Sequence, residues 1–469
     1  MQTSTPIIDL HIHSTLKPYG NSFYPNNDRT VFTNSSCIWF YDYRSRSDLR
    51  VEGALGICRY RQSDFKSLAD GQVKIACVSL YPIEKEFFNF KEGTFKKYEV
   101  VLADFTSMFG KNRINNVKAP GFNYFKDLCE EYEFLSCLDG TQVNGYTYRM
   151  MPDASSIDTP VNLQIIPSIE GCHAFCDGNN PSDPAQWKNI KDNVAVVKNW
   201  LSPPLFVTLA HHFYNGLCTH ARSLFDMSGN LLDQLHGMRD YGHTSYDQLP
   251  PISAIGRQMI DLLLKNDNER RILIDVKHMS REARQAYYQI LATDYAGQNI
   301  PVLCSHGAVA LDEALEINLD LDDLDMIYKT HGIIGLEMDQ RILGYNDKRF
   351  MKTVKGALHP GRESFKDAAY FWRQIVAIAE YSYKKGYTEN PWKCIALGSD
   401  YDGIINPLNT YPDATSLSVL YNNLIEHLED YWEQSVKVIP QPEGRDAADV
   451  IYEIMYKNAY DFIARHYQV

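Results

Sequence analysis

The first residues of this chain that could do chemistry are His11 and His13, which stand one residue apart in the stretch IIDLHIHST, residues 7–15. Residues i and i+2 of a β-strand point to the same side, so both imidazoles could reach one metal ion. A single His-x-His pair also arises by chance alternation along a strand, or as a satisfied pair of histidines in a protein core. The pair alone leaves both interpretations open.

Five other apolar runs also end in ionisable residues. These are Glu170 in IPSIEGCH, His211 in VTLAHH, His278 in LIDVKHMS, His306 in VLCSHG and Asp400 in ALGSDYDG. Imidazole is a preferred ligand of zinc and of neighbouring metals, and a carboxylate can bridge two ions. One tetrahedral ion cannot use seven such groups. The set therefore predicts a site for two divalent metal ions, with zinc as the expected metal.

The runs belong to a regular alternation of strands and helices. Apolar patterns predict eight strands, at residues 7–13, 73–82, 162–170, 205–212, 271–278, 300–306, 332–338 and 394–402. Helical periodicity predicts helices over residues 253–265, 281–292, 321–329, 363–385 and 447–466. Apolar strands that alternate with helices favour a parallel sheet, and eight such units favour a closed (β/α)8 TIM barrel. All seven candidate residues fall at the carboxyl ends of predicted strands, where barrel active sites lie.

Several of these residues also have an interpretation without a metal. His278 and His306 could be buried histidines that donate to backbone carbonyls, and Glu170 could be an ion-pair partner at the barrel mouth. Strand alternation sends the second histidine of VTLAHH, His212, to the side opposite the first. We therefore expect packing or solvent roles for it, and likewise for His173 and His220.

Length and composition fit a single globular barrel over residues 1–469, with 44% hydrophobic and 22% charged residues. The gaps at residues 14–72 and 83–161 are longer than a connection needs, which predicts insertions that cap the barrel. The second gap contains VNGYTY at residues 143–148, whose Asn-Gly pair is a hairpin signal and predicts extra β structure there.

Charge and motif content argue against several other classes. The formal net charge is -13 and no basic patch stands out, so we expect no nucleic-acid partner. No apolar run reaches membrane-spanning length and no export signal is recognisable, so we expect a cytoplasmic protein with no membrane partner. The 10 cysteines form no CxxC pair, which favours free or buried thiols. Dinucleotide, P-loop and serine-hydrolase motifs are absent from the sequence.

Taken together, the motifs resemble the membrane dipeptidase (renal dipeptidase) family of zinc peptidases, which are amidohydrolase-like barrels. LIDVKHMS is similar to the family's Ile-Asp-x-x-His-x-Ser strand, PVLCSHGA to its Pro-Val-x-x-Ser-His-Ser, ALGSDYDG to its Gly-Gly-Asp-Phe-Asp-Gly, and SIEGCHAF to its Glu-Gly-x-His. Gly256 and Arg257 match the family's Leu-Thr-x-x-Gly-Arg helix. The similarity is strongest over residues 205–403, and the order and spacing of the motifs carry it.

The resemblance implies a metal-dependent hydrolase that cleaves a small amide, most plausibly a dipeptide or a related acyl-amino compound. It implies two ion sites and two further roles. One ion would be held by His11, His13 and Glu170, and the other by Glu170, His278 and His306. His211 would contact the substrate carbonyl, and Asp400 would shuttle the proton. Barrel enzymes of this kind often form homodimers, and the sequence itself does not decide the oligomeric state.

Two departures from the family pattern bear on this assignment. The family begins with His-x-Asp, and here His13 supplies a neutral ligand in place of an anionic one, which should leave the site more positive. The family also places an arginine after the sixth strand to bind the dipeptide carboxylate, and here residues 310–318 read ALDEALEIN. Arg341 is a candidate replacement, with a surface or lid arginine as the alternative.

Two other functions remain open. DLHIHST also resembles the start of the polymerase-and-histidinol-phosphatase type of phosphoesterase, although that family does not explain IDVKHMS, SHGA and SDYDG together. A barrel that has kept its ligands but lost activity is the third interpretation, for which the missing arginine is one sign. Phosphomonoester turnover would favour the phosphoesterase, and a protein that stays empty of metal would favour the inactive barrel.

Overall fold

Eight parallel strands close into a barrel in the computed structural model, which describes residues 5–23, 35–42, 44–89, 96–223, 249–266, 270–311, 315–344, 362–387 and 390–468. The barrel strands are β1 (Ile7–Ile12), β2 (Val73–Leu80), β4 (Leu163–Ile169), β5 (Phe206–Thr208), β6 (Leu273–Asp275), β7 (Leu303–Gly307), β8 (Ile333–Leu336) and β9 (Ile395–Leu397). They pair in the order β2-β1-β9-β8-β7-β6-β5-β4, and β2 also pairs with β4, which closes the ring. The predicted (β/α)8 barrel and its eight strands are confirmed.

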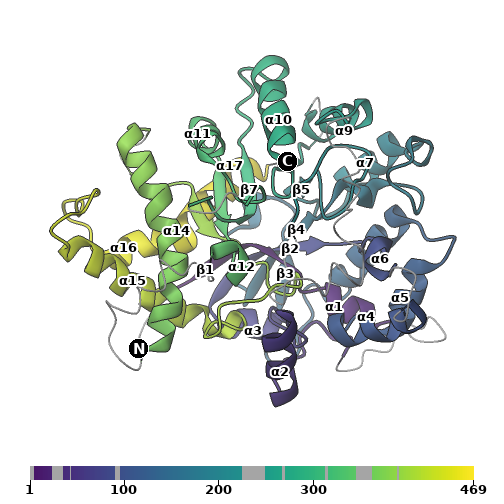
Figure 1. Cartoon of the computed structure of the whole chain (residues 1–469), viewed down its shortest axis with the longest axis horizontal. Coiled ribbons are helices and arrows are strands. Elements are labelled where there is room, and N and C mark those ends of the chain that lie inside the picture. Colours follow the sequence, from purple (N-terminus) through teal and green to yellow (C-terminus); the bar gives the residue numbers. More distant parts are fainter. Residues whose placement is uncertain are drawn as a thin grey trace.

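Helices surround this ring of strands (Figure 1). In the later half of the chain they are α9 (Ala254–Leu264), α10 (Arg281–Asp294), α11 (Leu321–Lys329), α12 (Gln340–Leu343), α14 (Glu363–Lys385), α15 (Leu417–Glu433), α16 (Ala447–Tyr452) and α17 (Asn458–His466). A π-helical turn at Glu453–Lys457 joins α16 to α17. The five predicted helices are confirmed, and their starts are marked by capping side chains such as Ser253, Ser280 and Asp320, which accept from backbone N–H groups of the first turn.

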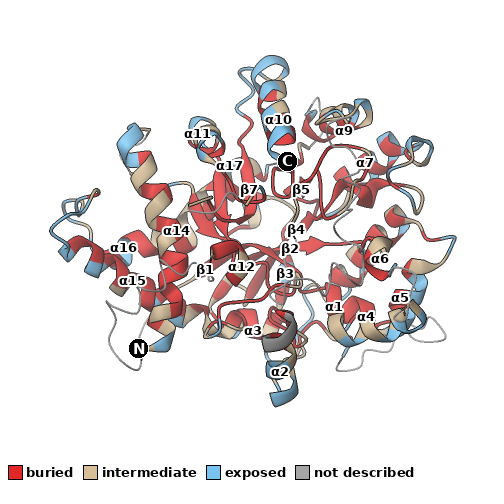
Figure 2. Cartoon of the chain, in the orientation of Figure 1, coloured by how far each residue is buried: buried red, intermediate tan, exposed pale blue. Residues whose placement is uncertain are grey.

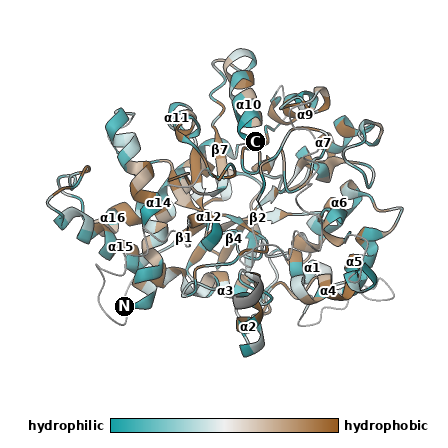
Figure 3. Cartoon of the chain, in the orientation of Figure 1, coloured by the Kyte–Doolittle hydropathy of each residue, from teal (hydrophilic) through white to brown (hydrophobic). Residues whose placement is uncertain are grey.

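The barrel strands are buried on both sides, which explains why their sequences read as almost unbroken apolar runs. Every residue of β1 and β4 is buried. Figure 2 shows burial concentrated in the central strands and on the inner sides of the helices, with exposed residues on the outer helix faces. The hydropathy colouring follows the same division (Figure 3). This packing fixes the strand ends that carry the candidate site.

The two long segments after β1 and β2 are mainly helical where they are described. The first contains α1 (Leu16–Asn21), α2 (Arg46–Leu55) and α3 (Phe65–Asp70), and the second contains α4 (Glu99–Ser107), α5 (Lys111–Lys118) and α6 (Tyr124–Ser136). The helix α7 (Ile190–Lys198) follows β4. In the described part of the second segment, extra β structure is confined to a tight turn, bridged between Val143 and Tyr146, and to β3 (Tyr148–Met150), which pairs with β4.

Two further expectations can be compared with the fold. All ten cysteines are free thiols, as the sequence predicts. Among the helices of the described ranges, none combines the length and the apolar character needed to cross a bilayer.

Candidate metal centre

The Glu170 carboxylate, directly after β4, lies at the centre of a cluster of five imidazoles. Its Oε2 is 2.9 Å from His13 Nε2 and 3.4 Å from His211 Nε2. Its Oε1 is 3.3 Å from His278 Nε2, 3.5 Å from His11 Nε2 and 3.6 Å from His306 Nε2. All six side chains belong to buried residues. The structure therefore brings together all six of these predicted residues around one carboxylate.

The cluster forms because each residue stands at the carboxyl end of a different barrel strand, except for the pair on β1. His278 and Asp400 reach it with a backbone in the left-handed region, at φ 66° and 59°. Residues other than glycine rarely adopt this conformation, and such strained positions gather at active sites and ligand-binding sites. The chain thus maintains two locally unfavourable turns at the strand ends that carry these side chains.

The opposite ring nitrogens of three histidines are engaged behind the cluster. Ser305 Oγ lies 3.1 Å from His11 Nδ1 and 2.9 Å from His306 Nδ1. His211 Nδ1 donates to Glu84, at 2.9 Å from Oε1 and 3.1 Å from Oε2. These contacts turn the Nε2 atoms toward Glu170, as is usual for metal-ligating histidines, whose other nitrogen is held by neighbouring groups.

The donor set fits two divalent ions. Burial lowers the pKa of His11 to about 4 and that of His278 to about 3, so both rings are neutral near pH 7 and have a free lone pair. His11 Nε2 and His13 Nε2 are only 3.1 Å apart, and the ligand atoms of Glu170, His278 and His306 lie within 4.8 Å of one another. Imidazole and carboxylate groups at this spacing are a zinc-type environment.

Asp400 lies beside the cluster without joining it directly. Its Oδ1 is 3.5 Å from His13 Nε2 and 3.7 Å from His11 Nε2, and the three ligand atoms lie within 4.8 Å of one another. Burial, together with the nearby carboxylates of Glu337 and Glu170, raises the pKa of Asp400 well above its usual value. A carboxylate with a raised pKa can hold a proton near neutral pH, which suits general acid–base catalysis.

His211 has the opposite electrostatic bias from the other histidines. Burial alone would lower its pKa, but the negative charges of Glu84 and Glu170 more than offset that cost and raise it. The pKa of Glu84 falls to about 2 in spite of its burial, because His211 and His173 lie close to the carboxylate. His211 can therefore donate from Nε2, whereas His11 and His278 are better suited to accept or ligate.

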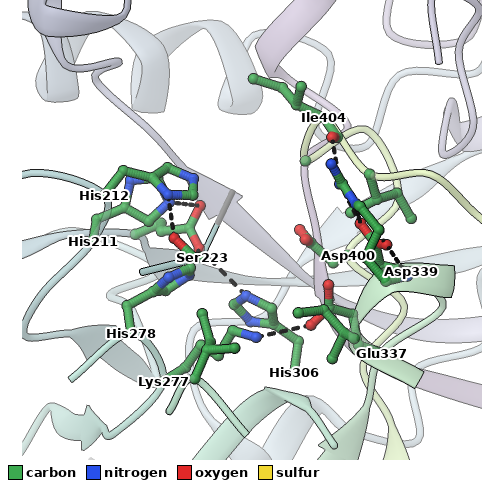
Figure 4. A pocket seen from close by; sticks show the side chains of 16 residues that line it. His211, His212, Ser223, Lys277, His278, His306, Glu337, Asp339, Asp400 and Ile404 are labelled. Atoms are coloured by element: carbon green, nitrogen blue, oxygen red, sulfur yellow. Dashed lines mark hydrogen bonds and ion pairs between the residues drawn. The ribbon is translucent and has the colours of Figure 1, made fainter. Parts of the chain in front are cut away.

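The β8 strand supplies charged residues that the sequence reasoning missed. Lys277 Nζ donates to Glu337 Oε2 at 2.8 Å, and both side chains are at most 4% exposed (Figure 4). Glu337 and Asp339 alternate in the stretch GLEMDQR at the end of β8, which could have been recognised as a strand end with two carboxylates facing the same side. Glu84, which follows β2, was also missed.

A small cavity of about 30 Å³ lies beside the cluster, and Arg341 lines it together with Asp400 and His306. Its guanidinium pairs with Asp339, donating from Nε at 2.9 Å and 3.0 Å to the two carboxylate oxygens, and Nη2 donates to Ile404 O at 3.3 Å. The Arg341 side chain is thus 7% exposed and paired beside the cluster. Of the stretch at 310–318, residues 312–314 lie outside the described residues.

The expected direction of His212 is wrong. β5 ends at Thr208, so strand alternation no longer applies four residues later, and His212 lines the cavity. Its ring centroid is 3.9 Å from that of His211 and 5.3 Å from that of His278 (Figure 4). His173, by contrast, is buried with Nε2 2.7 Å from Pro82 O, as a packing role requires.

Comparison with solved structures agrees with the barrel fold. The fold is similar to that of a metallopeptidase from Rhodobacter sphaeroides solved with a phosphinate mimic of the dipeptide L-Ala-D-Ala, at 14% identity and a TM-score of 0.54, over 99% of each chain. It is also similar to dipeptidase AC, a metallopeptidase of family M19, at 14% identity and a TM-score of 0.53, over 99% of this chain and 100% of the other. No curated protein sequence matches the chain.

The matched sequence segment supports a metal-dependent, dipeptidase-like hydrolase. Residues 236–441 match the sequence model of the membrane dipeptidase family, peptidase family M19. The matched segment includes His278, His306 and Asp400. The resemblance inferred from the motifs is confirmed by this match, and the residues on β1, β4 and β5 extend the site beyond it.

Proposed function

We propose that this protein is a binuclear metal-dependent hydrolase that cleaves a small amide, most directly the peptide bond of a dipeptide. The observation that carries the proposal is the position of Glu170, with both carboxylate oxygens facing histidine Nε2 atoms from four other strands. The family match supports the peptidase class, and the dipeptide mimic bound by the Rhodobacter sphaeroides relative supports a dipeptide-sized substrate.

The ligand assignment follows from the two sides of Glu170. His11 and His13 would hold one ion with Glu170 Oε2 or Oε1, and His278 and His306 would hold the second ion with the same carboxylate. We expect both ions to be zinc, because each would be held by two imidazoles and by the shared Glu170 carboxylate. When bound, two such ions would lower the pKa of a water between them and polarise the scissile carbonyl.

The protein's own groups would then orient the substrate and move protons. His211 Nε2, 3.4 Å from Glu170, would donate to the carbonyl oxygen and stabilise the negative charge that develops on it. Asp400 would accept the proton of the attacking water and deliver it to the leaving amine, which must be protonated to depart. Burial of the whole cluster strengthens these charge interactions relative to water.

For the substrate carboxylate we propose a contact with Arg341. Its guanidinium lines the same cavity as Asp400, and its pairing with Asp339 fixes its orientation. A planar guanidinium can share its donors between two carboxylates, which a lysine ammonium does less well. This contact would take the place of the arginine that the family carries after the sixth strand.

Amine release from a substrate panel tests the proposal. The zinc-loaded protein is incubated with L,L and L,D dipeptides, N-acylated dipeptides, C-terminally amidated dipeptides and a phosphomonoester. We expect release from free dipeptides and none from the phosphomonoester. Cleavage of the phosphomonoester alone would contradict the proposal, and so would silence on every amide by protein that contains both ions.

A further inference from the structure

Glu84 makes the closest contact behind His211. Both of its carboxylate oxygens face the same ring nitrogen, Nδ1, at 2.9 Å and 3.1 Å. The Glu84 side chain is 4% exposed, as is that of His211. The two residues are separated by 127 positions in the sequence and follow different strands, β2 and β5. The contact is therefore a product of the barrel and not of local chain geometry.

The geometry points to Glu84 as a positioning residue for His211, one that accepts the Nδ1 proton and holds the ring with Nε2 toward the reacting carbonyl. This inference rests on the proposed function and deepens it. An ionised carboxylate can only accept hydrogen bonds, so the proton between the two groups belongs to Nδ1. The ring is then fixed in one of its two flipped orientations, with Nε2 directed at the Glu170 side of the site.

His211 differs in this respect from the other four histidines around Glu170. A neutral hydroxyl, Ser305 Oγ, contacts the Nδ1 atoms of His11 and His306. In the described part of the chain, the Nδ1 atoms of His13 and His278 have no hydrogen-bond partner. Of these five rings, His211 alone has a carboxylate behind it, and a charged acceptor fixes the direction of the ring more firmly than a neutral hydroxyl does.

Glu84 is itself held in place. The hydroxyl of Tyr81 donates to Glu84 Oε2, and the Nδ1 atom of His173 lies 4.0 Å from Glu84 Oε1. His173 Nε2 is 2.7 Å from Pro82 O, so this ring is also fixed. The orientation of His211 is thus set by a chain of buried contacts that leads back to the end of β2. Such outer contacts typically change activity by about 10- to 100-fold when they are removed.

The test is a double-mutant cycle between Glu84→Gln and His211→Ala, read by steady-state kinetics on a dipeptide. We expect Glu84→Gln to lower kcat by about 10- to 100-fold with little change in KM and with both ions retained. In the His211→Ala background the same substitution should cost less than about twofold, because its only route to the reaction is gone. Glu84→Asp, which keeps the charge, should recover part of the loss.

Glu86→Gln is the matched control, since Glu86 lies in the short helical turn Lys85–Phe88 that directly follows Glu84 and is not among the partners of His211. It should leave kcat within about twofold of the parent. An equal loss from Glu84→Gln in both backgrounds would overturn the inference and assign Glu84 a purely structural role.

A second readout separates this inference from the proposed function. In protein with ¹⁵N-labelled histidine, the Nδ1–H proton of His211 should resonate far downfield, and Glu84→Gln should move that signal upfield. If the parent protein cleaves no amide, the proposed function fails while this signal still tests the contact. A signal that does not respond to Glu84→Gln would overturn the positioning role even in an active enzyme.

Discussion

Asp400→Asn separates proton transfer from metal binding, because the substitution keeps the shape of the side chain and removes its ability to take up a proton. Asp400 Oδ1 is 3.5 Å and 3.7 Å from the Nε2 atoms of His13 and His11, which is longer than a direct hydrogen bond. The amide should therefore fit the same space. Glu337 and Glu170 both disfavour a negative charge on Asp400. Removal of that charge by the substitution should therefore not lower the stability of the fold.

The magnitude follows from the role. A positioned general acid–base group contributes about 10²- to 10⁴-fold in rate, and each factor of ten corresponds to about 1.4 kcal/mol. We expect kcat to fall within that range, or about 3–5 kcal/mol in activation free energy. KM should change little, because Asp400 is assigned to the proton and not to the substrate.

The assay combines dipeptide kinetics, metal analysis and thermal unfolding of the same preparations. The expected variant has two ions, the parent's Tm and a strongly reduced kcat. Full activity would refute the assigned role. Loss of one ion would also refute it, and would make Asp400 a ligand together with His11 and His13.

Asp402→Asn is the control for this experiment. Asp402 stands two residues further on and accepts from Lys17 Nζ at 2.8 Å and from Ser63 N at 2.9 Å. Removing one partner of a buried ion pair costs about 3–5 kcal/mol of stability. The control should therefore unfold at lower temperature and keep the parent's kcat in the molecules that remain folded.

Three further outcomes are expected. In Gly403→Ala the new Cβ would lie 2.0 Å from Asp400 Oδ1 and must displace that carboxylate, so kcat should fall by about 100-fold with both ions retained; an unchanged kcat would show that Asp400 does not need its present position. Arg341→Lys should raise KM about tenfold for free dipeptides and leave KM for C-terminally amidated ones unchanged, and equal changes would remove Arg341 from carboxylate binding. Burial raises the pKa of Glu131 from 4.5 to about 7, so the stability that its protonated form confers is complete below pH 4.5 and is lost as pH rises through 7. The loss in the free energy of unfolding amounts to about 3 kcal/mol. In Glu131→Gln the Tm should therefore fall less between pH 5 and 8 than it does in the parent, and a fall as steep as the parent's would contradict the assignment.

Much of the fold was predictable because its periodicity is strong. Strands buried on both faces have few alternatives to a long apolar run, and helices such as Leu321–Lys329 and Glu363–Lys385 have clear boundaries in the sequence. The second long segment was harder to interpret. The Asn144-Gly145 pair does form the predicted turn. The longer described parts of that segment are helices, and an Asn-Gly pair carries no information on how those helices pack.

The candidate site was predictable where function requires a histidine or carboxylate at a strand end. Glu84 was not, because its contact with His211 spans 127 positions and leaves no spacing pattern. The error on His212 has a simple cause: alternation holds only within a strand, and β5 ends at Thr208. Lys277 and Glu337 form a buried pair that neither residue suggests alone.

Anomalous diffraction from crystals of the zinc-loaded protein is the most direct test of whether Glu170 would be shared by two metal ions. We expect two peaks on either side of Glu170, about 3.5–4 Å apart, one beside His11 and His13 and the other beside His278 and His306. A single peak, or ions that do not contact Glu170, would contradict this expectation.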